Sequence, residues 1–213
     1  PMIAGKHKGA GMLLYPAQVA EVLAPIAEYP EIQFSLKMRL GWENASECMV
    51  LVELLNTLRL SRIALHARTG KQQYKGHPDL EAFQGFYELC QHPLYYNGGI
   101  ESLSDIRQIL IRFPLLKGVF IGRGLLSSPL LAKEFKGNET FLPEQRMSIY
   151  FAFHEELFSA YSQVLQGETQ LLVKMKTLWE YFLPETDRKL LKRIKKSTRL
   201  QQYTESVKAI FTS

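Results

Sequence analysis

The sequence has little cysteine and no long apolar run. It holds 2 cysteines among 213 residues, Cys48 and Cys90, which lie far apart. Their spacing matches neither a disulfide framework nor a metal site, so we expect two core thiols on helices and no metal. No apolar stretch approaches the roughly 20 residues that a membrane span needs. These absences predict a cytoplasmic protein with no membrane partner.

The composition is typical of a folded protein with a moderate excess of positive charge. Apolar residues make up 46% of the chain and charged residues 22%, which is enough to bury a core. The net charge is +5, and the positive excess is most concentrated toward the carboxyl end. We expect one domain and a second, smaller one.

The segment 34–40 is the first that combines a clear secondary-structure pattern with charge. As a strand it places Phe34, Leu36, Met38 and Leu40 on one face, and Ser35, Lys37 and Arg39 on the other. Two cations on an inner face would need anionic or hydrogen-bonding partners. The alternative is an edge strand with both cations in water.

Strand and helix patterns then alternate four times along the chain. The pattern predicts a parallel sheet with right-handed crossovers, either open and doubly wound or closed as a (β/α)8 barrel. The predicted helices are 16–29, 45–58 with an Asn44–Glu47 cap, 80–91, and one that begins at a Ser102–Asp105 cap; the strands are 34–40, 62–67, 93–97 and 118–121.

Polar and glycine residues fall at the carboxyl end of each predicted strand. They are Lys37 with Arg39, His66 with Arg68, Asn97-Gly98-Gly99 and Gly122-Arg123-Gly124. Both architectures place their sites at this end, and glycine-rich ends on the last two strands match the phosphate site of a barrel. A lone histidine or Asn-Gly turn has an ordinary structural explanation. Alignment at four successive strand ends favours a ligand site.

The chain changes to helices alone from about Leu142. Aromatic and aliphatic residues recur through 144–165 and 171–182, and a basic segment follows at 188–199. This segment holds seven cations and no acid: Arg188, Lys189, Lys192, Arg193, Lys195, Lys196 and Arg199. Such a face either is solvated or binds the phosphates of a folded RNA.

Several motifs together resemble the tRNA-dihydrouridine synthases. They are KGAGMLLYP at 8–16, KMRLGW at 37–42, HART at 66–69, QYKG at 73–76, YNGGI at 96–100 and IGRGLLSSPLL at 121–131. The resemblance covers about residues 1–135. It implies an α/β fold, the C-terminal half of a (β/α)8 TIM barrel over 1–138, followed by a small all-α helical domain over 139–213 that binds tRNA.

The resemblance also implies a flavin-dependent oxidoreductase that reduces uridine to 5,6-dihydrouridine in tRNA, with FMN as cofactor and NADPH or NADH as reductant. By residue-by-residue correspondence, the cofactor-binding residues are Lys37, His66, Asn97, Gly98, Gly99, Gly122 and Arg123. The substrate-side residues are Arg39, Arg68 and Tyr74. With the basic segment assigned to RNA, Lys192, Lys195 and Arg199 join the tRNA-binding set.

One feature departs from the family pattern. The family's catalytic acid is a cysteine directly before a proline that corresponds to Pro1, and neither Cys48 nor Cys90 matches it. We therefore expect no catalytic residue in this chain, a missing N-terminal half of the barrel as its partner, and an inactive isolated chain. Two other functions stay open: a flavin-dependent barrel reductase of a small molecule, and a non-catalytic RNA-binding remnant.

Overall fold

The computed structural model describes residues 7–212 and divides the chain into two compact units. The first is Pro1–Gly122 and the second is Arg123–Ser213. The sequence predicts a later domain boundary, at 138/139. The division falls earlier because Leu130, on the predicted barrel side of that boundary, belongs to the hydrophobic core of the second unit.

A four-stranded parallel sheet forms the centre of the first unit. Its strands are β1 (Phe34–Gly41), β2 (Leu60–Thr69), β3 (Leu94–Asn97) and β4 (Gly118–Phe120), and they pair in the order β1-β2-β3-β4. Every pairing is parallel, which confirms the predicted parallel sheet. Since the order never reverses, successive right-handed crossovers carry the chain across the sheet in one direction.

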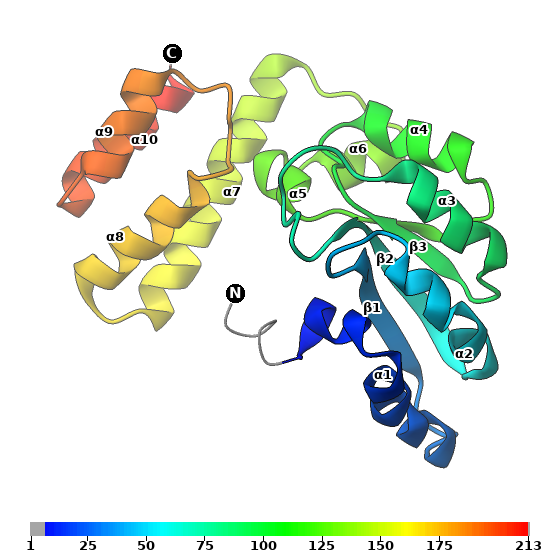
Figure 1. Ribbon diagram of the computed structural model, residues 1–213. Helices are drawn as coiled ribbons and strands as arrows, with labels where there is room; N and C mark the ends of the chain where they lie inside the picture. Colours follow the sequence, from blue (N-terminus) through cyan, green and yellow to red (C-terminus); the bar gives the residue numbers. More distant parts are fainter. Residues whose placement is uncertain (1–6, 213) are drawn as a thin grey trace. The chain divides into compact units, whose positions relative to one another are not determined.

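The helices of the first unit follow from this connectivity. Because the crossovers share one hand and one direction, the connecting helices lie on one side of the sheet, as Figure 1 shows for α2, α3 and α4. The bounds are η2 (Gly9–Leu14), α1 (Pro16–Leu23), η3 (Ala24–Glu28), η4 (Glu47–Leu51), α2 (Val52–Thr57), α3 (Leu80–Leu89) and α4 (Leu103–Arg112).

The two faces of the sheet differ in burial. Residues of the helix side, such as Ile63, Leu65 and Tyr96, are buried and form the core with Phe83 and Phe86 of α3. The residues between them on the strands point to the opposite face. The register aligns two rows there: Lys37, Ala64, Tyr95 and Gly118, and then Arg39, His66, Asn97 and Phe120. This second face carries the polar groups.

The structure tests two predicted helix caps and the predicted helix 16–29. The Ser102–Asp105 capping box of α4 is confirmed, with both reciprocal hydrogen bonds. The predicted helix 16–29 is α-helical only to Leu23 and continues as 3-10 helix η3, which begins beside Pro25, a residue without an N–H donor. The predicted Asn44–Glu47 cap forms only in part: the Glu47 carboxylate accepts from the Asn44 N–H, but η4 has no side-chain cap hydrogen bond.

The two cysteines also differ. Cys48 is fully buried in η4, and burial raises the pKa of its thiol to about 12. Cys90 is half-buried just after the end of α3, where burial raises its pKa as well. Both are therefore thiols rather than thiolates at neutral pH.

The second unit consists of helices alone, which confirms the change of pattern after Leu142. Its elements are α5 (Arg123–Ser127), α6 (Leu131–Gly137), α7 (Pro143–Val164), α8 (Gly167–Leu178), α9 (Arg188–Lys196) and α10 (Leu200–Phe211). The sequence analysis did not predict α5 or α6. Between residues 7 and 212, no helix is both long and apolar enough to cross a membrane.

A buried polar network lies inside the core of the second unit. Trp179 Nε1 donates to the Tyr203 hydroxyl at 2.9 Å, and that hydroxyl lies 2.7 Å from His154 Nε2. His154 Nδ1 lies 3.0 Å from a carboxylate oxygen of Glu155. Burial lowers the pKa of His154, which favours the neutral ring. Each polar group is then satisfied if Tyr203 donates to Nε2 and Nδ1–H donates to Glu155.

Candidate functional site

Lys37 and Asn97 meet on the polar face of the sheet. Lys37 Nζ donates to Asn97 Oδ1 at 3.2 Å, and Asn97 Nδ2 donates to the Phe120 carbonyl at 2.8 Å. The residues come from β1, β3 and β4, and the parallel register brings them together although 60 positions separate Lys37 from Asn97. The amide therefore holds the ammonium group in place across the middle of the sheet.

His66 lies beside the glycine turn that follows β3. A Cβ atom built on Gly98 would lie 3.4 Å from His66 Cδ2, and Gly98 has a φ of 139°. Gly99 also has a positive φ, of 60°, and a Cβ there would lie 2.9 Å from Pro78. Both positions therefore require glycine, which lets the backbone of this turn lie close to His66 and Pro78.

Arg39 and Arg68 donate to the loop that follows β2. Arg39 Nη1 lies 2.8 Å from the Thr69 carbonyl and 3.3 Å from that of Gln73, and Arg68 Nη1 lies 2.7 Å from the Lys75 carbonyl. Arg68 is 4% exposed, and its Nε is a buried donor with no hydrogen-bond partner among the described residues. A buried donor left unpaired is costly, so a ligand oxygen at this atom would be favourable.

Tyr74 extends from the same loop. It is 60% exposed, and its ring centroid lies 6.4 Å from that of His66. The structure thus brings Lys37, Arg39, His66, Arg68, Tyr74 and Asn97 to one end of the sheet. Gly122 follows β4 in the first unit, with no atom within 4 Å of a Cβ built there, whereas Arg123 begins α5 in the second unit.

The electrostatics of this group favour an anion. Burial lowers the pKa of Lys37, and the neighbouring Arg39 lowers it further. Burial also lowers the pKa of Arg39, an effect that Tyr74 opposes and Arg68 reinforces. Burial and a neighbouring cation thus both disfavour the charged forms of Lys37 and Arg39, and a negatively charged ligand would stabilise them.

An apolar hollow adjoins these cations. It has a volume of about 430 Å³ and is lined by η2, α1, β1 and the helices that follow β1. Residues from both faces of β1 line it, so it runs along the strand edge that has no partner strand in the sheet. Lys37 and Arg39 are the charged residues of an otherwise apolar lining.

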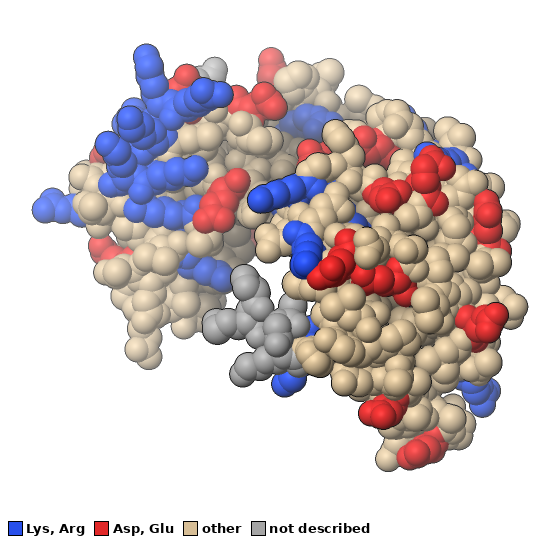
Figure 2. All heavy atoms as spheres, in the orientation of Figure 1, with Lys and Arg blue, Asp and Glu red and all other residues tan. Residues whose placement is uncertain are grey.

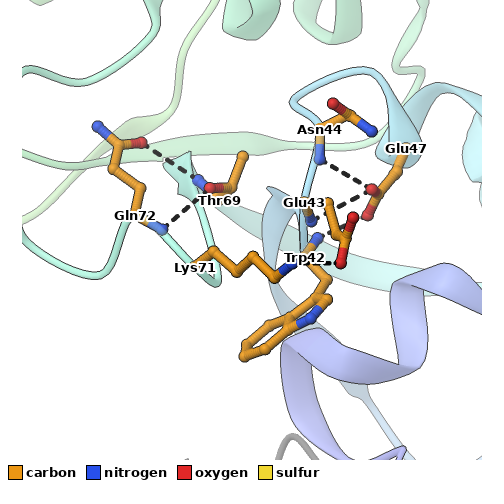
Figure 3. Close-up of polar contacts among 7 residues, drawn as sticks. All are labelled: Trp42, Glu43, Asn44, Glu47, Thr69, Lys71 and Gln72. Atoms are coloured by element: carbon orange, nitrogen blue, oxygen red, sulfur yellow. Dashed lines mark hydrogen bonds and ion pairs between the residues drawn. The ribbon is translucent and has the colours of Figure 1, made fainter.

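The loops after β1 and β2 are interlocked (Figure 3). The Glu47 carboxylate accepts from the backbone N–H groups of Trp42, Glu43 and Asn44, at 2.6, 3.2 and 2.8 Å. The Lys71 side chain forms an ion pair with Glu43 at 2.5 Å. The backbone N–H of Lys71 donates to the Trp42 carbonyl. The sequence predicts Glu47 as one half of an Asn44–Glu47 cap, and its bond to the Asn44 N–H confirms that half; its bonds to Trp42 and Glu43 were not predicted.

Gly70→Ala is expected to destabilise the first unit by about 1–3 kcal/mol. A Cβ atom at residue 70 would lie 2.1 Å from Cε3 of Trp42, so the indole ring would have to move. Chemical denaturation of both proteins measures the change. Gly122→Ala is the matched control, since a Cβ there contacts nothing. Equal unfolding free energies for wild type and Gly70→Ala would contradict the proposed packing.

The second unit carries a separate basic face. All seven cations of the basic segment are exposed, and none forms an ion pair within 4 Å in the part of the chain that the structure describes. Figure 2 shows Lys and Arg gathered where α9 lies. A groove of about 490 Å³ runs along it, lined by four cations, Lys189, Lys192, Arg193 and Lys196, by one acid, Glu205, and by Ser197, Gln202 and Ser206.

The cations that line this groove differ from the predicted tRNA-binding residues Lys192, Lys195 and Arg199. Of these three, only Lys192 lines it; the other cations of the lining are Lys189, Arg193 and Lys196. The basic segment 188–199 is not a single helix. The helix α9 ends at Lys196, where the Ser197 hydroxyl donates to the Ile194 carbonyl, and Arg199 is the residue before α10.

Comparison with known proteins gives consistent matches. The family model described as dihydrouridine synthase (Dus) matches residues 1–212. A probable tRNA-dihydrouridine synthase of Aquifex aeolicus (strain VF5) is 34% identical over 135 residues, which are 62% of this chain and 42% of that protein. One of Rhizobium leguminosarum bv. phaseoli is 29% identical over 128 residues, or 60% of this chain and 40% of that protein.

A third relative is the tRNA-dihydrouridine synthase B of Vibrio vulnificus (strain CMCP6). It is 25% identical over 143 residues, which are 65% of this chain and 44% of that protein. The chain therefore spans less than half the length of these curated relatives.

Proposed function

Because the chain belongs to the dihydrouridine synthase family, we propose that its residues serve the FMN-dependent reduction of uridine to 5,6-dihydrouridine in tRNA. The observation that carries this proposal is the contact of Lys37, on the polar face of β1, with Asn97 at the carboxyl end of β3. It supplies a fixed cation where this class of fold binds its ligands.

We propose that the four strands form part of a (β/α)8 barrel. The order β1-β2-β3-β4 supports this, since a doubly wound sheet reverses its strand order at a switch point and this sheet does not. The all-helical second unit is the proposed RNA-binding domain. The proposed barrel also gives the polar face of the sheet its role as the inner, ligand-facing surface.

The residues present fit FMN. The free space at Gly122 and the lowered pKa of Lys37, caused by burial and by the neighbouring Arg39, each suit an anionic, acceptor-rich group. In this assignment Lys37 and His66 contact the flavin, while Asn97, Gly98, Gly99, Gly122 and Arg123 hold its phosphate. A bound flavin would supply the reducing equivalents, with NADPH or NADH as their source.

The other polar residues have proposed roles on the substrate side. Arg39, Arg68 and Tyr74 would contact the target uridine, which must leave its base stack to reach a site at this depth. Lys37 would stabilise negative charge on the ring system beside it. The Cys48 thiol is buried in the core with a pKa of about 12, so it is a poor candidate for the acid. The cysteine expected before Pro1 lies outside the described residues.

We assign the basic face of α9 to tRNA phosphates. The charges stand in a row along a groove, without carboxylate partners within 4 Å among residues 7–212, which suits a phosphate backbone better than a self-neutralised surface. The proposed contacts are Lys192, Lys195 and Arg199, together with Lys189, Arg193 and Lys196 of the groove.

Replacing Lys192, Lys195 and Arg199 by glutamine is expected to weaken tRNA binding and flatten its salt dependence. Each lost phosphate contact lowers the slope of log K against log salt by about one unit. A second triple variant, at Lys189, Arg193 and Lys196, tests the groove. A variant of Lys133, Lys136 and Lys174 removes equal charge elsewhere. If the slope of log K against log salt is the same for all three variants and the wild type, the cations of α9 are solvated and do not bind tRNA.

The proposed function is tested by two measurements on the 213-residue chain and on any longer natural polypeptide that carries it. FMN binding is measured by quenching of flavin fluorescence. Dihydrouridine is measured by mass spectrometry of tRNA after incubation with FMN and NADPH or NADH. FMN-dependent gain of two hydrogens at a uridine supports the proposal. Absence of both FMN binding and product in every such polypeptide would refute it.

A further inference from the structure

Gln72 makes an unusual number of hydrogen bonds within the loop that joins β2 to α3. Its Nε2 donates to the carbonyls of Lys75 and His77, at 2.9 and 2.8 Å. Its Oε1 accepts from the Thr69 N–H at 3.4 Å, and its own N–H donates to Thr69 Oγ1 at 3.2 Å (Figure 3). One neutral side chain therefore joins the start of the loop to its far end.

The two arginines of the site hold the same loop from the sheet. Arg39 donates to the carbonyls of Thr69 and Gln73, and Arg68 donates to that of Lys75. Gln72 and Arg68 thus share the Lys75 carbonyl. Four carbonyl oxygens of this segment, those of Thr69, Gln73, Lys75 and His77, accept from side chains instead of from secondary structure.

The loop needs this support because its backbone is strained. Gln73 has a φ of 53°, a left-handed conformation that side chains other than glycine disfavour, and Gly76 has a φ of 63°. The hydrogen bonds of Gln72 span both positions. These hydrogen bonds offset the strain and favour one backbone conformation from Gln73 to Gly76.

Tyr74 lies between the held carbonyls of Gln73 and Lys75. Its side chain is 60% exposed, so little packing restrains it, yet its ring lies 6.4 Å from that of His66. Its position therefore depends on the backbone on either side, in addition to its electrostatic interaction with Arg39. We propose that Gln72 is a positioning residue, which holds this loop so that Tyr74 stays against His66 at the mouth of the site.

The inference rests on the proposed function in one respect, the role of Tyr74 on the substrate side. Gln72 itself contacts the loop and has no assigned contact with substrate or cofactor. Its effect on the proposed reaction would come through the placement of Tyr74.

The first test is the rate of tryptic cleavage after Lys71 and Lys75 in the 213-residue chain. Gln72→Glu keeps the length of the side chain but replaces the two donating N–H groups by an oxygen that faces two carbonyls. Because two hydrogen bonds are lost, cleavage in the loop is expected to accelerate on the order of tenfold, as it should in Gln72→Ala. Gln73→Ala is the control, since the Gln73 side chain makes no hydrogen bond among the described contacts, and its rate should match the wild type.

The second test follows the position of Tyr74 and needs no turnover. The imidazole proton resonances of His66, assigned with a His66→Gln variant, should move in Gln72→Glu because the ring of Tyr74 shifts, and should stay in Gln73→Ala. With an active preparation, the KM for tRNA should rise severalfold with a smaller change in kcat. If the wild-type protein forms no dihydrouridine, the proposed function is refuted. The cleavage rate and the His66 resonances then still decide whether Gln72 positions the loop. Wild-type cleavage and an unmoved His66 resonance in Gln72→Glu would overturn the proposal.

Discussion

Lys37→Met is expected to lower FMN affinity by about 10- to 150-fold, the effect of losing a charge-assisted hydrogen bond worth about 1.5–3 kcal/mol. The replacement removes the cation that Asn97 holds at 3.2 Å and keeps the length of the side chain. The strand should stay folded, because the packing of β1 against the helices comes from residues such as Met38 and Leu40 on its other face. Flavin titration by fluorescence measures the loss.

Two comparisons make this test specific. Lys37→Arg keeps the charge and should retain more affinity than Lys37→Met. Lys117→Met removes an exposed cation just before β4, at the opposite end of the sheet, and should bind FMN as the wild type does. Equal flavin affinity in Lys37→Met, Lys117→Met and the wild type would remove Lys37 from the cofactor site.

The second large effect concerns stability, where Tyr203→Phe is expected to lower the free energy of unfolding by about 2–5 kcal/mol. The substitution keeps the aromatic ring but deletes the hydroxyl that joins Trp179 Nε1 to His154 Nε2. Two buried polar groups would then lack partners, and water cannot reach them easily because Tyr203 is 0% and His154 1% exposed. Urea denaturation monitored by circular dichroism gives the difference.

Tyr181→Phe provides the matched control for the loss of a tyrosine hydroxyl. Tyr181 is 38% exposed, and its hydroxyl takes part in none of the described hydrogen bonds, so its removal should change stability by less than about 0.5 kcal/mol. If Tyr203→Phe were as stable as Tyr181→Phe, the network would contribute nothing, and the hydroxyl would serve only to fill space.

The strand β1 and the start of helix α4 could be predicted from the sequence because each depends on residues close together in the chain. The period-two pattern of 34–40 separates apolar from polar residues on β1, and the reciprocal bonds of Ser102 and Asp105 lie within one helical turn. The matched motifs likewise led to the family that the comparison shows. In contrast, the Asn44 side chain forms no cap at the start of η4, and the chain there is held by the Glu47 carboxylate, which accepts from the N–H groups of residues 42–44.

The contacts of the loops were out of reach of sequence reasoning. Gln72 resembles any polar loop residue until the course of residues 70–79 brings the Lys75 and His77 carbonyls within 3 Å of its amide. Similarly, the basic segment was visible as composition, but the groove that selects Lys189, Arg193 and Lys196 exists only once α10 packs beside α9.

By itself, the sequence determined the alternation of strands and helices, the family, and the presence of cations at the strand ends, because periodicity and motif depend on residues close together in the chain. Only the tertiary structure decided which of these residues meet. Lys37 reaches Asn97 because three strands align in parallel register, and a chain position carries no information about that register until the sheet forms. Hydrogen bonds between distant residues depend on positions within a fraction of an ångström, which packing sets and composition does not.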